Sequence, residues 1–119
     1  GCQEEPTISL GNPIEITEGD SGDKELICMV NLDNPAPDDG VTVQVEPHNI
    51  TANEGEDYSR VDSIVHFSKG ESQKEIVYKI HGDTKIEDNE TFSIELLSPQ
   101  NAKLDENHTT TIATIINDD

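Results

Sequence analysis

Polar and hydrophobic residues alternate along most of this 119-residue chain. Val41, Val43 and Val45 give the clearest example, because a valine stands at every second position with a polar residue between. A period of two is typical of a β-strand that buries one face, whereas an amphipathic helix repeats its apolar residues every three to four positions. No segment of the sequence keeps the helical repeat, so we predict an all-β protein.

The alternation predicts seven strand regions, separated by turns rich in Gly, Pro, Asn and Asp. These regions are residues 7–17, 24–32, 41–45, 64–67, 75–81, 91–97 and 109–116. Pro13 interrupts the first region and cannot donate a ladder hydrogen bond, so we expect a two-part edge strand. Residues 46–62 are predicted to form a loop, and Ser98-Pro99 to end the sixth strand. The β-branched last region suits the middle of a sheet. Seven strands with polar turns favour a two-sheet antiparallel β-sandwich.

The length of the chain is enough for one domain and too short for two independent cores. Only 31% of the residues are hydrophobic and 3% are aromatic, which predicts a narrow, aliphatic core. We assign residues 1–6 to an N-terminal tether and residues 7–119 to the sandwich domain. No apolar run approaches the roughly 20 residues that a membrane-spanning helix needs.

The charge of the chain is strongly negative, with 26 acidic against 7 basic side chains and a formal net charge of -19. Such a surface repels phosphate groups, so we exclude nucleic acids and anionic membranes as partners and expect cations instead. Many of the acids gather at the ends of predicted strands. These are Glu18 with Asp20, Glu54 with Glu56 and Asp57, Asp83 with Glu87, Asp88 and Glu90, and Asp118 with Asp119.

Acidic loops at one end of a sandwich meet in space, where they either remain a solvated rim or share a cation. Ca²⁺ takes six to eight oxygen ligands in a tolerant geometry, whereas Mg²⁺ requires a tighter octahedral shell. The two Cys and four His residues lack the spacing of a zinc site. The residue types therefore favour calcium over the other metals.

Five short motifs, in the same order along the chain, resemble those of the Calx-beta family. They are Ile16-Thr-Glu18-Gly19-Asp20-Ser-Gly22, Thr51-Ala-Asn-Glu-Gly55-Glu-Asp57-Tyr58, Phe67-Ser-Lys-Gly70-Glu-Ser, Asp83-Thr-Lys-Ile-Glu87-Asp-Asn-Glu90-Thr-Phe92 and Ile115-Ile-Asn-Asp118-Asp119. The resemblance implies an immunoglobulin-like sandwich. The family occurs in sodium/calcium exchangers, in matrix and adhesion proteins and in bacterial surface proteins. Its calcium-binding members hold the ions between loops at one end.

The resemblance also implies a set of calcium ligands. Carried over by position, these are Glu18, Asp57, Asp83, Glu87, Glu90, Asp118 and Asp119. Gly82 and Asn117 stand where calcium-binding members often carry a further aspartate, and each removes one charge. We therefore expect one good site or two weak ones, with affinity in the millimolar class of extracellular modules.

The sequence around Cys2 resembles the end of a bacterial lipoprotein signal, because Gly1-Cys2 precedes a polar tether. We expect Cys2 to be the lipid attachment site, which would place the domain at a bacterial cell surface. Two alternatives are a disulfide between Cys2 and Cys28 and an incidental Gly-Cys pair. Cys28 lies in the apolar row of a predicted strand, which is typical of a small buried residue.

No residue pattern indicates catalysis, because the sequence lacks a nucleophile elbow and no single pair of carboxylates stands out. We predict a non-catalytic, calcium-binding cell-surface or adhesion module whose partner is a neighbouring domain or another surface protein. One alternative is a regulatory calcium sensor of a transporter. Another is a calcium-independent sandwich that binds proteins through an exposed strand edge.

Overall fold

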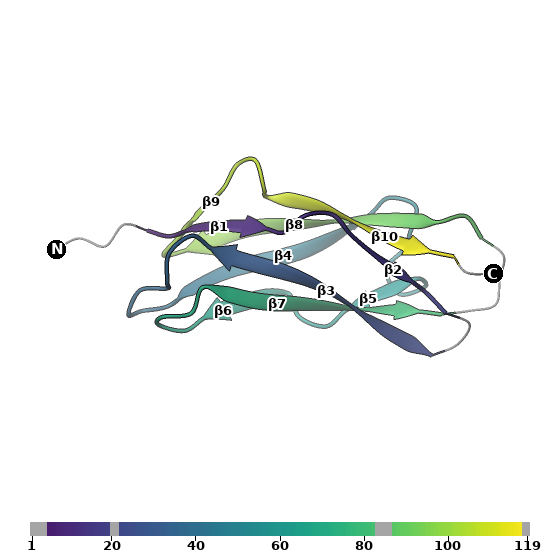
Figure 1. Ribbon diagram of the computed structural model, residues 1–119, viewed down its shortest axis with the longest axis horizontal. Helices are drawn as coiled ribbons and strands as arrows, with labels where there is room; N and C mark the ends of the chain where they lie inside the picture. The colour runs from purple at the N-terminus through teal and green to yellow at the C-terminus, as the bar shows by residue number, and fades with distance from the viewer. Residues whose placement is uncertain (1–4, 20–21, 83–86, 118–119) are drawn as a thin grey trace.

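A computed structural model describes residues 5–19, 22–82 and 87–117, and it confirms the all-β prediction (Figure 1). Every regular element in these residues is a β-strand. The strands form two sheets that pack into an elongated sandwich, 58 Å along its longest axis and 18 Å along its shortest. No helix in the same residues is long and apolar enough to cross a membrane.

The described chain contains ten strands. They are β1 (Thr7–Leu10), β2 (Ile14–Thr17), β3 (Asp23–Leu32), β4 (Val41–Asn49), β5 (Tyr58–Arg60), β6 (Ile64–Phe67), β7 (Gln73–His81), β8 (Glu90–Gln100), β9 (Lys103–Leu104) and β10 (Thr110–Ile116). One sheet has the order β5-β7-β3-β1-β9 and the other has the order β2-β10-β8-β4-β6. β10 lies between two neighbours, as its β-branched sequence predicts.

The predicted number of seven strands is wrong. The break at Gly11–Pro13 divides the first region between the two sheets, so that β1 pairs with β3 while β2 pairs with β10. Residues 46–62 are not one loop, because β4 continues to Asn49 and β5 follows it. β8 runs past Ser98 and Pro99, and the short β9 completes the count.

The sandwich is also not purely antiparallel. β9 pairs with β1 in parallel, over Thr7 to Ile8, and β2 pairs with β10 in parallel, over Ile14 to Thr17. The other named strand pairs are antiparallel. β1 and β2, on either side of the crossing at Gly11–Pro13, thus each have a parallel partner in their own sheet.

The core is the aliphatic interior expected from the alternation, and its side chains come from the inward positions of both sheets. Cys28 is a free, buried thiol within it, as expected for a small apolar residue, and burial raises the pKa of this thiol to about 11. Three of the four aromatic side chains, Tyr58, Tyr78 and Phe92, contact one another in this core.

One end of the sandwich collects the loops that carry the acidic motifs. The end of β2, the start of β3, the end of β7, the start of β8 and the end of β10 lie together at the end marked C in Figure 1. Backbone hydrogen bonds join them: Glu18 donates to Ile116, and Gly82 donates to Gly22, each over 3.0 Å. We call this end, with Glu18, Asp57, Glu87 and Glu90, the acidic pole.

Candidate metal centre

Three carboxylates meet at the acidic pole. Asp57, Glu87 and Glu90 each place a carboxylate oxygen within 4.8 Å of the other two, and all three side chains are partly buried. Asp57 immediately precedes β5, Glu87 lies in the segment that leads into β8, and Glu90 is the first residue of β8. Two loops that are 30 residues apart in the sequence thus contribute to one cluster of oxygen atoms.

The electrostatics of this cluster centre on Glu90. The pKa of Glu90 is raised to about 8, and burial of its carboxyl group is the largest cause. The close approach of this group to the acidic groups of Glu87 and Asp57, and the negative charge of those groups, raise the pKa further. The Oε2 atom of Glu90 is buried and accepts no hydrogen bond from the residues that the structure describes. Glu87 and Asp57 have no hydrogen to donate as carboxylates. A proton on Glu90 or a cation can relieve the repulsion.

Asp57 is held by a tight local turn. Its Oδ2 accepts a hydrogen bond from the Asn53 amide over 2.8 Å, and its own amide donates to the Asn53 carbonyl over 2.9 Å. The Asp57 carbonyl accepts from the His81 amide over 3.0 Å, which ties the turn to the end of β7. The backbone that presents this carboxylate is therefore fixed from two directions.

Aromatic packing fixes the spacing between the two acidic segments. The ring of Tyr58, next to Asp57, is stacked on the ring of Phe92, two residues after Glu90. The Tyr78 ring meets both of them edge-on. The Tyr58 hydroxyl donates to Asn49 Oδ1 over 2.6 Å, so this buried ring also satisfies its polar end.

A second connection joins the Asp57 loop to β8. The Thr51 amide donates to the Thr91 carbonyl over 3.0 Å, and the Thr91 amide donates to Thr51 Oγ1 over 2.8 Å. Thr91 follows Glu90 directly, so these bonds hold the two acidic segments side by side. Sequence reasoning missed the role of Thr51, because only the folded chain brings it to Thr91.

Glu18 lies at the same pole and is buried, with 6% of its surface exposed. Its amide is bonded to the end of β10, where the predicted ligands Asp118 and Asp119 follow in the sequence. It is not part of the three-carboxylate cluster of the described residues. The predicted ligands Asp83, Asp118 and Asp119, and the predicted lipid site Cys2, lie outside the described residues, so these assignments stay predictions.

The two missing aspartates have structural reasons. A Cβ atom at Gly82 would lie 2.9 Å from the carbonyl oxygens of Glu18 and Gly19, so a side chain does not fit without moving the backbone. Asn117 donates from its side-chain amide to the Glu87 carbonyl, and its backbone amide donates to Asn89 Oδ1 over 2.9 Å. Aspartate has no N–H in its side chain and would lose the first of these bonds.

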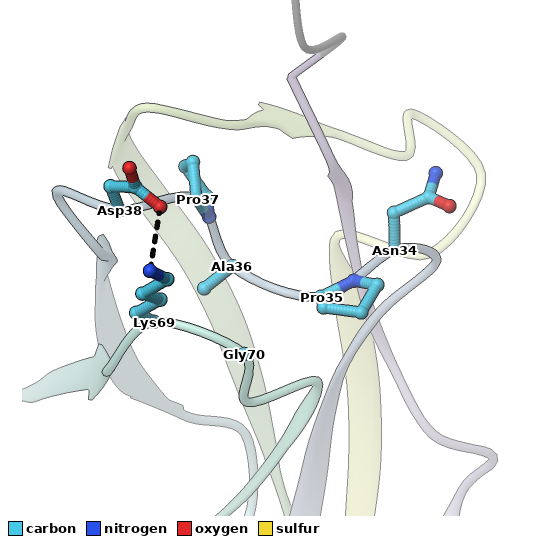
Figure 2. Close-up of a pocket in the computed structure, with 7 residues that line it drawn as sticks. All are labelled: Asn34, Pro35, Ala36, Pro37, Asp38, Lys69 and Gly70. Atoms are coloured by element: carbon cyan, nitrogen blue, oxygen red, sulfur yellow. Dashed lines mark ion pairs between the residues drawn. The ribbon is translucent and has the colours of Figure 1, made fainter.

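A cavity of about 490 Å³ lies between the β3–β4 and β6–β7 turns (Figure 2), which are at the end of the sandwich opposite the acidic pole (Figure 1). It is lined by the turn from Asn34 to Asp38 and by Lys69 and Gly70. Its one acidic side chain, Asp38, faces Lys69 Nζ at 3.3 Å, so the two charges balance. This cavity lacks the clustered carboxylates that a hard cation needs.

Comparisons with known proteins agree on the type of domain. A family model described as "Calx-beta domain" matches residues 4–119. The apo-form Calx CBD1 domain superposes with a TM-score of 0.76 at 21% identity, covering 98% of this chain and 100% of that one. A structure described as the calcium binding domain CBD12 of CALX1.1 gives 0.80 at 20% identity, covering 94% and 46%. The Calx CBD2 domain gives 0.78 at 18% identity, covering 95% and 90%. A comparison with curated proteins finds no match.

Proposed function

Because the chain belongs to the Calx-beta family, we propose that it is a non-catalytic module that binds Ca²⁺ at the acidic pole. One observation carries this proposal: the carboxylates of Asp57, Glu87 and Glu90 converge, and a buried oxygen of Glu90 receives no donor from the described residues. One of the similar solved structures is itself described as a calcium binding domain.

The spacing of the cluster suits calcium. Ligand oxygens lie 2.3–2.6 Å from Ca²⁺, so two of them on opposite sides of one ion are about 5 Å apart. The three carboxylate oxygens lie within 4.8 Å of one another and therefore fit one shell. Three carboxylates alone do not complete six to eight ligands, and we assign the remaining positions to Glu18, Asp83, Asp118, Asp119 and water.

We further propose that calcium stiffens the acidic pole at a junction with a neighbouring domain or another surface protein. The chain carries a net charge of -19, and the acidic pole concentrates several of its carboxylates. Bringing this pole against another surface therefore costs electrostatic free energy until a cation neutralises it. Regulation of a transporter is the second candidate, because the Calx-beta family also occurs in sodium/calcium exchangers. Attachment to a cell surface through Cys2 rests on the sequence alone, and mass spectrometry of the N-terminal peptide from the native source would test it.

Thermal unfolding with Ca²⁺ and with EDTA tests the calcium proposal. A ligand that binds only the native state stabilises it by RT ln(1 + [L]/Kd), so millimolar Ca²⁺ should raise the melting temperature. Asp57→Asn combined with Glu90→Gln should abolish this increase. Asp38→Asn combined with Asp39→Asn at the other end also replaces two exposed carboxylates, serves as the matched control and should keep it. Identical melting curves with Ca²⁺ and EDTA would favour the calcium-independent protein-binding sandwich.

A further inference from the structure

The side chain of His81 connects three strands just below the acidic pole. Its Nδ1 lies 2.8 Å from Asp23 Oδ1, and its Nε2 lies 2.8 Å from Ser59 Oγ. Its backbone amide donates to the carbonyl of Asp57 over 3.0 Å. One residue therefore contacts β3, β5 and the turn that presents a candidate calcium ligand.

The position of His81 in the sheet explains this reach. His81 is the last residue of β7 and stands opposite Asp23, the first residue of β3. Tyr78 and Ile80 are buried, so the alternate residues Lys79 and His81 face outward. Ser59 on β5 is paired with Lys79 and lies on the same outward face. The imidazole thus bridges the two strands that flank β7.

Each of these contacts leads directly to a loop of the acidic pole. Ser59 is two residues from Asp57, and Asp23 follows Gly22, whose carbonyl accepts the Gly82 amide. Gly82 itself packs closely against the carbonyl oxygens of Glu18 and Gly19. A change in the position of the imidazole would therefore shift the loops of Asp57 and Glu18 relative to each other.

We propose that His81 is a positioning residue of the calcium site, and that the Ser59–His81–Asp23 chain of hydrogen bonds holds the ligand loops in register. This inference rests on the proposed function. Both ring nitrogens have a partner, which fixes the ring orientation, and the Asp23 carboxylate, which only accepts hydrogen bonds, places a proton on Nδ1. Loss of a partner that bonds a metal ligand directly commonly costs 10–100-fold in metal affinity; the His81 side chain acts one step further out, through Ser59 and Asp23, so we expect an effect at the lower end of this range.

The same three residue types also form the relay of serine hydrolases. Hydrolysis additionally needs a concave pocket with donors that stabilise an oxyanion. Ser59, His81 and Asp23 instead lie on the outward face of a sheet, and half of the Asp23 side chain is exposed. Their connection to the Asp57 turn supports a positioning role.

The chain offers a matched control for this proposal. His108 forms a similar pair with Asp105, with Nδ1 2.9 Å from Oδ2, in the turn between β9 and β10. Both histidines thus pair with an aspartate at the surface. The β9–β10 turn lies away from the acidic pole (Figure 1).

Calorimetric titration of the 119-residue chain with Ca²⁺ tests the inference. We expect His81→Leu to weaken binding on the order of 10-fold and Ser59→Ala to weaken it several-fold. His108→Leu should leave Kd within about twofold of the wild type. His81→Gln keeps one donor and one acceptor and should recover part of the affinity. In EDTA, His81→Leu and His108→Leu should melt at similar temperatures, which separates positioning from general destabilisation.

Two outcomes contradict the inference in different ways. If the wild type binds Ca²⁺ and His81→Leu binds with the same Kd, His81 is not a positioning residue, although the calcium proposal stands. If the wild type itself shows no binding, the calcium proposal fails and this inference fails with it. If His81→Leu does not fold, Ser59→Ala decides the question, because it removes only one hydroxyl group. An unchanged Kd of Ser59→Ala would then show that the Ser59–His81–Asp23 hydrogen bonds do not position the calcium ligands.

Discussion

The aromatic rings of Tyr58 and Phe92 are stacked with their centroids 3.8 Å apart and an angle of 8° between their planes. Both rings are fully buried, and each belongs to a segment that also carries a carboxylate of the acidic pole. The stack is therefore part of the core and also sets the separation of Asp57 from Glu90. Stability and the proposed calcium binding therefore depend on the same contact.

We expect Phe92→Ala to lower the free energy of unfolding in EDTA by about 3–5 kcal/mol, because it leaves a cavity and removes the stacked partner of Tyr58. Urea denaturation measures this change. Ile64→Ala is the control, since that side chain is 66% exposed and should change stability by less than about 0.5 kcal/mol. Equal effects of the two variants would show that the aromatic stack is not central to the core.

The raised pKa of Glu90 predicts how the stability of the metal-free domain depends on pH. With a folded-state pKa of about 8 against an ordinary value of 4.5, folded Glu90 keeps a proton that the unfolded chain releases. The folded state then binds more protons between these values, so stability should fall as pH rises from 5 to 8. Urea denaturation in EDTA at several pH values measures this slope. Glu90→Gln should reduce it, and an unchanged slope would contradict the assignment.

Gly82→Ala should destabilise the domain by about 1–3 kcal/mol, because the added Cβ meets two backbone carbonyl oxygens at 2.9 Å and backbone atoms cannot rotate away. Gly11→Ala is the matched control, since its Cβ would meet only the Met29 carbonyl, at an ordinary 3.8 Å. Chemical denaturation in EDTA compares the two. If Gly82→Ala is as stable as Gly11→Ala, the close packing at Gly82 does not explain the missing aspartate.

Asn117→Asp should lower stability in EDTA by about 1–2 kcal/mol, because it removes the side-chain donor to the Glu87 carbonyl and adds a negative charge to the acidic pole. Thermal melting in EDTA checks this expectation. Asn34→Asp adds the same charge at the other end and should have little effect. In millimolar Ca²⁺ the deficit of Asn117→Asp should shrink, since a bound cation compensates the added charge. A deficit that does not change with calcium would argue against a cation at this pole.

Much of the fold follows from the sequence pattern where strands are long and half buried. The alternation predicts β6 with its observed bounds and finds the centres of β3, β7, β8 and β10. It fails at β5 and β9, because strands of two or three residues have no measurable period. Pairing with a longer strand creates these elements, and such pairing depends on the tertiary fold.

Pro47 lies inside β4, within the stretch 46–62 that the sequence analysis predicts as a loop. A proline inside a predicted strand argues against that strand, since it cannot donate to a ladder. In the structure β6 pairs with β4 only from Val41 to Gln44, so β4 has one open side at Pro47. The missing N–H therefore disrupts no pairing with β6, and the strand continues to Asn49 along β8.

The sequence likewise predicts only part of the candidate site. Motifs in the sequence indicated the acids, and the structure brings Asp57, Glu87 and Glu90 together with Glu18 at the same pole. The groups that hold them, such as Thr51, Asn117 and His81, act through hydrogen bonds between segments 22 or more residues apart. A linear sequence does not show which of many polar residues make such bonds.

The parallel pairing of β2 with β10 has a mechanical consequence. The two strands lie side by side and run in the same direction, although one is near the beginning of the described chain and the other near its end. Tension that draws the two chain ends apart therefore slides these strands past each other lengthwise. Their hydrogen bonds would then bear the load together and rupture in one event, so the domain should resist stretching more strongly than a sandwich whose terminal strands peel apart bond by bond.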